Sequence, residues 1–147
     1  MVIESYSGFA QRYNMMIGVL ICAFSTSLLF LIMPSGIFFM ADIFLVAGNC
    51  IGLYITFKNR KESQKYIITG IIVGVAGSVL SILLISLFEW ILFSLTSGFD
   101  FILFLNYTLF LLLNLAVFYV PVGMLLGWLF GNRFRKRELV IKESPLF

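Results

Sequence analysis

Four long apolar runs, separated by turns and short polar stretches, dominate the pattern of hydrophobic and polar positions along the chain. They cover about residues 13–33, 37–57, 67–95 and 101–131. A helix rises about 1.5 Å per residue, so crossing a hydrocarbon core of about 30 Å takes roughly 20 residues. Each run is long enough, and the pattern therefore predicts four transmembrane helices in a single domain, 1–147, with no separate soluble module.

The segments between the runs indicate how the predicted helices are arranged. Met33, Pro34, Ser35 and Gly36 form a turn so short that the first two helices must be antiparallel neighbours. Residues 58–65 form the only strongly polar loop. We therefore expect an all-α integral membrane four-helix bundle with antiparallel neighbours.

The basic residues all fall on one side of this pattern. Of the ten Lys and Arg residues, Arg12 precedes the first run, four lie between the second and third runs, and five follow the fourth. The connections at 33–36 and 94–100 carry no basic residue. Cytoplasmic loops of membrane proteins are enriched in Lys and Arg, so both termini are predicted to be cytoplasmic. We expect a multi-pass protein of the plasma or cell membrane.

The third and fourth runs are longer than a bilayer requires, reaching roughly 43 and 46 Å as helices. Aromatic residues next to polar ones mark the outer boundary near Glu89 and Tyr107. The spanning helices then cover about 67–90 and 106–131, residues 132–147 form a basic cytoplasmic tail, and residues 91–105 form an apolar hairpin cap outside the hydrocarbon. An apolar tip of this kind predicts a partner surface or a segment lying among headgroups. Its candidate contact residues are Phe93, Phe99, Phe101 and Phe104.

Composition restricts the class of protein further. The chain is 61% hydrophobic and 12% charged, which leaves too little polar surface to cover a soluble fold. The basic loops and tail should attract anionic headgroups at the cytoplasmic face. We interpret them mainly as a topology signal and expect no nucleic-acid partner.

Small residues at four-residue intervals predict where two helices approach closely. Gly70 and Gly74 share one face of the third helix, and Gly123 and Gly127 share one face of the fourth. Counting from the basic side places Gly70 opposite Gly127 and Gly74 opposite Gly123. Small side chains at such a crossing let the backbones meet.

Polar residues inside the predicted spans are the candidates for an intramembrane site. Asp42 lies near the outer end of the second helix, and Asn49 follows on the same face. Depth counted at about 1.5 Å per residue places Ser27, Ser81 and Asn114 in the layer of Asp42. A carboxylate at this depth is costly unless it is paired or protonated. The layer is either a proton- or cation-responsive site or a set of interhelical hydrogen bonds.

Two further carboxylates lie toward the outer side. Glu89 and Asp100 have no basic neighbour there, and together with Asp42 they are candidates for an outer acidic mouth that concentrates cations.

Catalytic chemistry finds little support in the sequence. There is no histidine, and the two cysteines, Cys22 and Cys50, lie inside predicted helices and form no CxxC motif. Established catalytic motifs are missing as well. We therefore expect a protein that is not an enzyme and that uses no cofactor and no metal.

Three hypotheses about function remain open. The leading one is an accessory or assembly subunit of a larger membrane complex, with a membrane-protein partner or self-association. The alternative is a homo-oligomeric small channel, or a cation- or proton-coupled transporter, that uses Asp42. A third is binding of a lipid or hydrophobic ligand between the helices.

Overall fold

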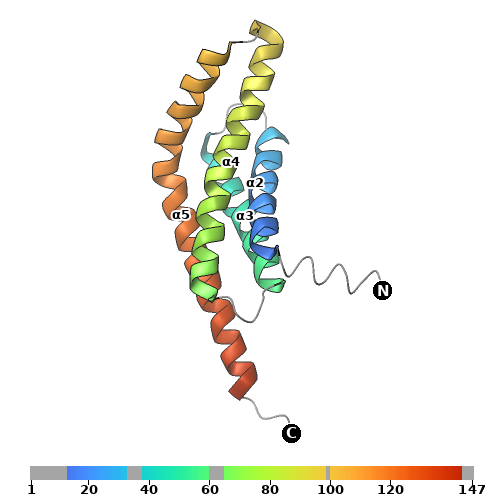
Figure 1. The fold of residues 1–147 in the computed structure, drawn as a ribbon, viewed down its shortest axis with the longest axis vertical. Coiled ribbons are helices and arrows are strands. Elements are labelled where there is room, and N and C mark those ends of the chain that lie inside the picture. Colours follow the sequence, from blue (N-terminus) through green and yellow to red (C-terminus); the bar gives the residue numbers. More distant parts are fainter. Residues whose placement is uncertain (1–12, 33–37, 60–64, 99, 144–147) are drawn as a thin grey trace, which may run out of the picture.

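The described part of the chain folds entirely into helices. A computed structural model describes residues 13–32, 38–59, 65–98 and 100–143. They form α2 (Asn14–Ile32), α3 (Phe38–Lys58), α4 (Tyr66–Ser97) and α5 (Phe101–Glu143), which run alternately up and down (Figure 1). The prediction of an all-α fold with four helices is confirmed for this part of the chain.

The last two helices are much longer than the first two. α4 has 32 residues and α5 has 43, against 19 in α2 and 21 in α3. Residues 91–97 continue α4, and α5 starts at Phe101 and runs on through most of the basic tail. Gly98 ends α4 with a φ of 86°, a conformation that glycine adopts without steric cost.

Two of the helices are long and apolar enough to cross a membrane. These stretches are Tyr66–Thr96 in α4 and Phe101–Leu139 in α5, whereas the apolar stretches of α2 and α3 within the described residues are shorter. The α4–α5 hairpin runs well beyond the ends of α2 and α3 (Figure 1). About 12% of the most apolar part of α5 is buried, compared with 44% in α4. α5 thus leaves most of its apolar surface uncovered.

Helix packing joins two hairpins. α4 packs most extensively against α5, α2 packs against α3 and α4, and α3 touches α5 less. One core cluster toward the basic end contains Cys22, Leu53, Phe57 and Val73. A second cluster joins Leu45, Ile82 and Tyr119 from three helices.

Close approach of α4 and α5 rests on their glycines. A Cβ atom added to Gly70 would overlap the carbonyl of Gly127, and one added to Gly74 would overlap the carbonyl of Gly123. This is the pairing that the four-residue spacing predicts, and it leaves no room for a larger side chain at either crossing.

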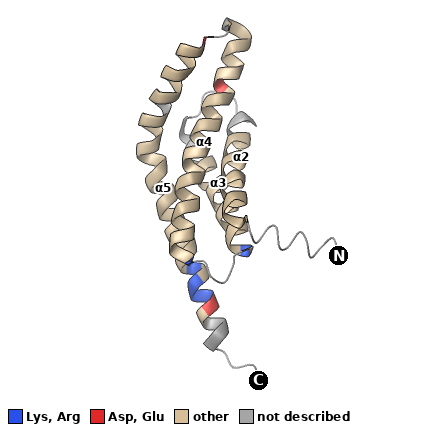
Figure 2. Ribbon diagram, viewed as in Figure 1, with Lys and Arg blue, Asp and Glu red and all other residues tan. Residues whose placement is uncertain are grey.

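Charged residues divide between the two ends of the molecule. The described basic residues gather at one end, where α2 begins, α3 ends, α4 begins and α5 leaves the bundle (Figure 2). Those whose side chains the structure describes are Lys58, Lys65, Arg133, Arg135, Lys136 and Arg137. Glu89 and Asp100 lie toward the opposite end.

Candidate functional site

A cluster of buried polar side chains lies where α2, α3 and α4 meet. Asn49 of α3 is completely buried, and its Nδ2 donates a hydrogen bond to Ser78 Oγ of α4 over 3.2 Å. The Ser78 hydroxyl in turn donates to the Gly74 carbonyl at 2.9 Å. This chain of hydrogen bonds ties α3 to the face of α4 that carries the glycines.

Two further hydrogen bonds join α2 to α3. The fully buried Cys22 thiol donates to the Asn49 carbonyl over 3.7 Å. Near the basic end, Asn14 Nδ2 donates to the Thr56 carbonyl over 3.2 Å. Sequence analysis missed both contacts, because Asn14 lies at a predicted helix end and a lone cysteine gives no pattern.

The Asn49 side-chain oxygen has no hydrogen-bond partner among the described residues. It faces Gly77 of α4, where an added Cβ would lie 3.2 Å from Oδ1 and 2.7 Å from Cys22 Cβ. The missing side chain at Gly77 therefore makes the space that Asn49 and Cys22 occupy. Burying a hydrogen-bond acceptor without a donor in the interior of the bundle costs free energy. Asn49 Oδ1 differs in this respect from the hydrogen-bonded atoms around it.

The two serines predicted for the site, Ser27 and Ser81, donate their hydroxyl hydrogens to backbone carbonyls of their own helices. Ser27 Oγ donates to Ala23 O at 2.8 Å, and Ser81 Oγ donates to Gly77 O at 2.7 Å. Both are buried, and both bonds run to the residue four positions earlier. Such back-bonding uses the hydroxyl hydrogen locally. In this arrangement neither residue donates to Asn49.

The structure does not bring Asn114 to the cluster. Asn114 is exposed on α5, and its Nδ2 donates to the Phe110 carbonyl of the same helix at 2.7 Å. Gly123, which faces α4, lies nine residues further on, about half a turn away around a helix of 3.6 residues per turn. Depth counting gives the height of a residue along the helix but not the side of the helix on which it lies. For this reason the expectation that Asn114 joins the polar layer is corrected.

Asp42 belongs to α3, two helical turns from Asn49, but its side chain lies outside the described residues.

The two outer carboxylates have different structural roles, since that of Glu89 joins α4 to α5 and that of Asp100 bonds within the start of α5. Glu89 of α4 accepts a hydrogen bond from the Tyr107 hydroxyl of α5. Asp100 Oδ1 accepts hydrogen bonds from the backbone N–H groups of Ile102 and Leu103 at 2.9 and 3.1 Å. Asp100 thus caps the start of α5, a structural role typical of aspartate at a helix N-terminus.

The candidate cap residues differ in exposure. Phe93 and Phe101 are exposed, whereas Phe104 packs on Trp90 with ring centroids 4.8 Å apart. Phe99 lies outside the described residues. Neighbouring large apolar side chains are also exposed, and the exposed fraction is highest for Leu95, at 79%, and Ile102, at 71%.

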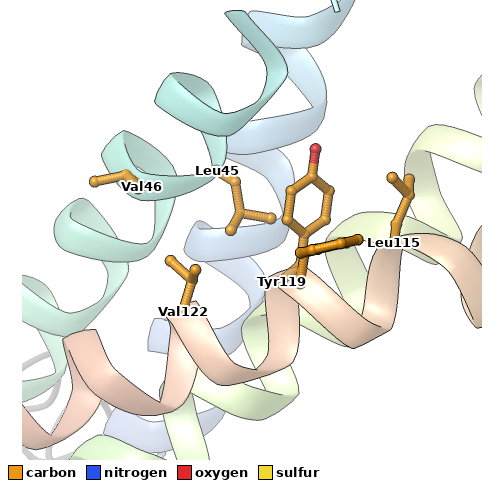
Figure 3. Close-up of a pocket in the computed structure, with 6 residues that line it drawn as sticks. Leu45, Val46, Leu115, Tyr119 and Val122 are labelled. Atoms are coloured by element: carbon orange, nitrogen blue, oxygen red, sulfur yellow. The ribbon is translucent and has the colours of Figure 1, made fainter. Parts of the chain in front are cut away.

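A groove of about 470 Å³ separates part of α3 from α5 (Figure 3). Apolar side chains line it from both helices, together with the ring of the buried Tyr119. They are Leu45, Val46, Leu115, Phe118, Tyr119 and Val122. A second groove of about 580 Å³ lies at the basic end between α4 and α5, and Lys65 and Arg135 are among its lining residues.

The chemistry available at these places is that of packing and hydrogen bonding. The polar cluster offers amide, hydroxyl and thiol groups, and the described residues contain no group of three or more His, Cys, Asp or Glu side chains placed to hold a metal ion. Comparison of the chain with protein-family models, with curated proteins and with solved structures found no match.

Proposed function

We propose that this chain is a non-catalytic multi-pass membrane protein that acts as an accessory or assembly subunit of a larger membrane complex. The observation that carries the proposal is the apolar α4–α5 hairpin, which continues past α2 and α3 with large side chains exposed on both of its helices. Contiguous exposed apolar surface of this kind typically marks a site of interaction.

The length of the hairpin supports a surface that lies beyond the lipid. α4 is about 48 Å long at about 1.5 Å per residue, whereas a hydrocarbon core is about 30 Å thick. With the basic end in the cytoplasm, the last turns of α4 and the first turns of α5 project outward. Leu95 and Ile102 would then be exposed to water unless another protein or the headgroup layer covered them.

The interior of the bundle supports a structural role over catalysis. Among the described residues its buried polar groups belong to Asn, Ser, Thr, Cys and Tyr119, and most of the hydroxyls are hydrogen-bonded to their own helix. Interhelical hydrogen bonds such as Asn49 to Ser78 fix helix positions at about 0.6 kcal/mol each on average.

Native mass spectrometry of the protein released gently from its own membrane tests the proposal. We expect a reproducible hetero-complex, and Phe93→Asp should release the partner because a buried charge at the contact is costly. Phe93→Leu, which keeps the surface apolar, is the matched control and should retain the partner. Recovery of the chain without any other protein, or unchanged co-purification of Phe93→Asp, would count against the proposal.

The groove between α3 and α5 favours a second candidate function, the binding of a lipid chain or another hydrophobic ligand. Its lining is almost wholly apolar, and Pro121 of α5 lies next to the lining residue Val122, where proline leaves one backbone carbonyl without its helical hydrogen bond. Val122→Phe should fill part of the groove and lower binding of a fluorescent fatty-acid probe. Val117→Phe, on the exposed side of the same helix, is the control and should leave binding unchanged.

A further inference from the structure

One exposed stripe of α5 repeats with the spacing of a coiled-coil seam. Its members follow one another at alternating intervals of four and three residues, and all of them are exposed. We call this stripe the α5 seam, and it consists of Phe110, Asn114, Val117, Pro121, Met124 and Trp128. Residues at such intervals lie along one side of a helix and face a second helix along its length.

The α5 seam has the dimensions of a membrane contact. From Phe110 to Trp128 it extends about 27 Å, close to the thickness of a hydrocarbon core of about 30 Å. Before the seam in the chain, Tyr107 donates a hydrogen bond to Glu89 of α4. After the seam, the basic residues begin at Arg133. The seam therefore occupies the part of α5 that the proposed membrane placement leaves against lipid.

Asn114 is a polar residue in the seam, whereas a helix surface that faces only lipid is expected to be apolar. It lies about 25 Å from Gly131, which packs against the first turn of α4, and thus inside the proposed hydrocarbon layer. Its neighbours along the seam, Phe110 and Val117, are 61% and 67% exposed. One N–H of the amide is used by the Phe110 carbonyl. The amide still has hydrogen-bonding capacity on a face where lipid offers no partner.

The charge distribution indicates which partner can form a hydrogen bond with the Asn114 amide. Because the basic residues lie at one end, every copy should insert in the same direction. Two copies related by a two-fold axis along the membrane normal then run parallel and bring identical residues face to face. An amide both donates and accepts, so Asn114 is complementary to Asn114 of a second copy. A single Asn in an apolar seam is a known means of setting helix register and oligomeric state.

We propose that the α5 seam is a homodimer interface in which Asn114 of one copy hydrogen-bonds Asn114 of the other within the membrane. This inference rests on the membrane placement proposed above, but not on the accessory role, since the hairpin tip remains free for another partner. The seam ends at Trp128, and the paired basic segments beyond it separate because like charges repel.

Energy transfer between copies that carry a donor or an acceptor dye at the C-terminus tests the dimer. The protein is placed in phosphatidylcholine–phosphatidylglycerol vesicles and diluted with lipid. The parent should dimerise, and Asn114→Leu should weaken the dimer about 3- to 30-fold. Asn106→Leu makes the same change at an exposed position of α5 that lies beyond Tyr107 and therefore past the end of the seam, and it should behave like the parent.

Thiol crosslinking locates the interface independently of dimer strength. In a Cys50→Ser background, in which the remaining Cys22 is fully buried, Val117→Cys should crosslink two copies with a short bifunctional reagent. Leu109→Cys, exposed on a different side of α5, should not. A parent that stays monomeric at all dilutions, an Asn114→Leu dimer as tight as the parent, or preferential crosslinking at Leu109 would overturn the proposal.

Alkaline extraction of each variant separates failure of the dimer from failure of the membrane placement. Protein that remains in the membrane but does not dimerise overturns the seam alone. Protein that is washed out of the membrane overturns the placement on which the seam rests.

Discussion

Asn49 and Ser78 form a hydrogen bond that joins α3 to α4 in the middle of the bundle, with 3.2 Å between amide nitrogen and hydroxyl oxygen. Both residues are completely buried. Ser78 also donates to Gly74, which lies against Gly123 of α5. The Asn49–Ser78 hydrogen bond is thus linked through Gly74 to the close contact between α4 and α5, the two longest helices.

Removing the Ser78 hydroxyl should destabilise the bundle, because it leaves the Asn49 amide buried without an acceptor. We expect Ser78→Ala to lower the free energy of unfolding by about 0.5–2 kcal/mol. Ser81→Ala, which removes only a bond within α4, is the control and should cost less. Reversible unfolding in mixed micelles measures both. Equal losses for the two variants would show that the bond between helices adds nothing.

Enlarging Gly74 should push α4 and α5 apart, since the neighbouring atom is a backbone carbonyl that cannot rotate away. Overpacking in a close contact typically costs about 1–3 kcal/mol, so Gly74→Val should lower the free energy of unfolding by about 1 kcal/mol or more. Ile72→Ala changes the exposed side of the same helix and should have little effect in detergent. A Gly74→Val protein as stable as the parent would contradict the close crossing.

Tyr107→Phe should loosen the outer part of the hairpin, because Glu89 loses its hydrogen bond from α5. A hydrogen bond contributes about 0.5–1.5 kcal/mol, so amide hydrogen exchange in residues 91–105 should become about two- to tenfold faster. Exchange around Asn49 should not change. Tyr54→Phe, at an exposed tyrosine of α3, provides the control. Uniformly faster exchange along the chain would instead indicate a global loss of stability.

Asp42 provides the test between the accessory role and the channel alternative. Under the accessory proposal, proteoliposomes that contain the parent should show no cation or proton flux above that of empty vesicles. Asp42→Asn should then leave both flux and fold unchanged. A flux that the parent carries and Asp42→Asn abolishes, with the bundle intact, would favour the channel or transporter.

Sequence patterns sufficed for the features that depend on periodicity. The four helices follow from the lengths of the apolar runs, and the crossing of Gly70 with Gly127 follows from regular spacing along two helices counted from a common end. These properties are set by composition and by the constant rise of a helix, which a sequence displays directly.

The candidate site required the structure, because side chains at one depth can point in different directions. Asn114 has the height of the polar layer but lies on the exposed side of α5. Ser27 and Ser81 are buried, yet their hydroxyls turn back to their own helices. The rotation of a helix about its axis and the local choice of hydrogen-bond acceptor depend on tertiary packing. Gly77, which makes space for Asn49, carries no pattern of its own.

The three-residue interval between Ser97 and Phe101 bears on how the chain folds during synthesis. Since α5 begins almost where α4 ends, the closest pair of helices in the molecule forms from neighbouring segments, with little entropy lost in closing the loop. The pair α2–α3 is likewise local, whereas the contact between α3 and α5 joins distant parts of the sequence. Assembly should therefore proceed as two helical hairpins that dock late, mainly through α2 and α4, and the groove remains where the two hairpins meet less closely, between α3 and α5.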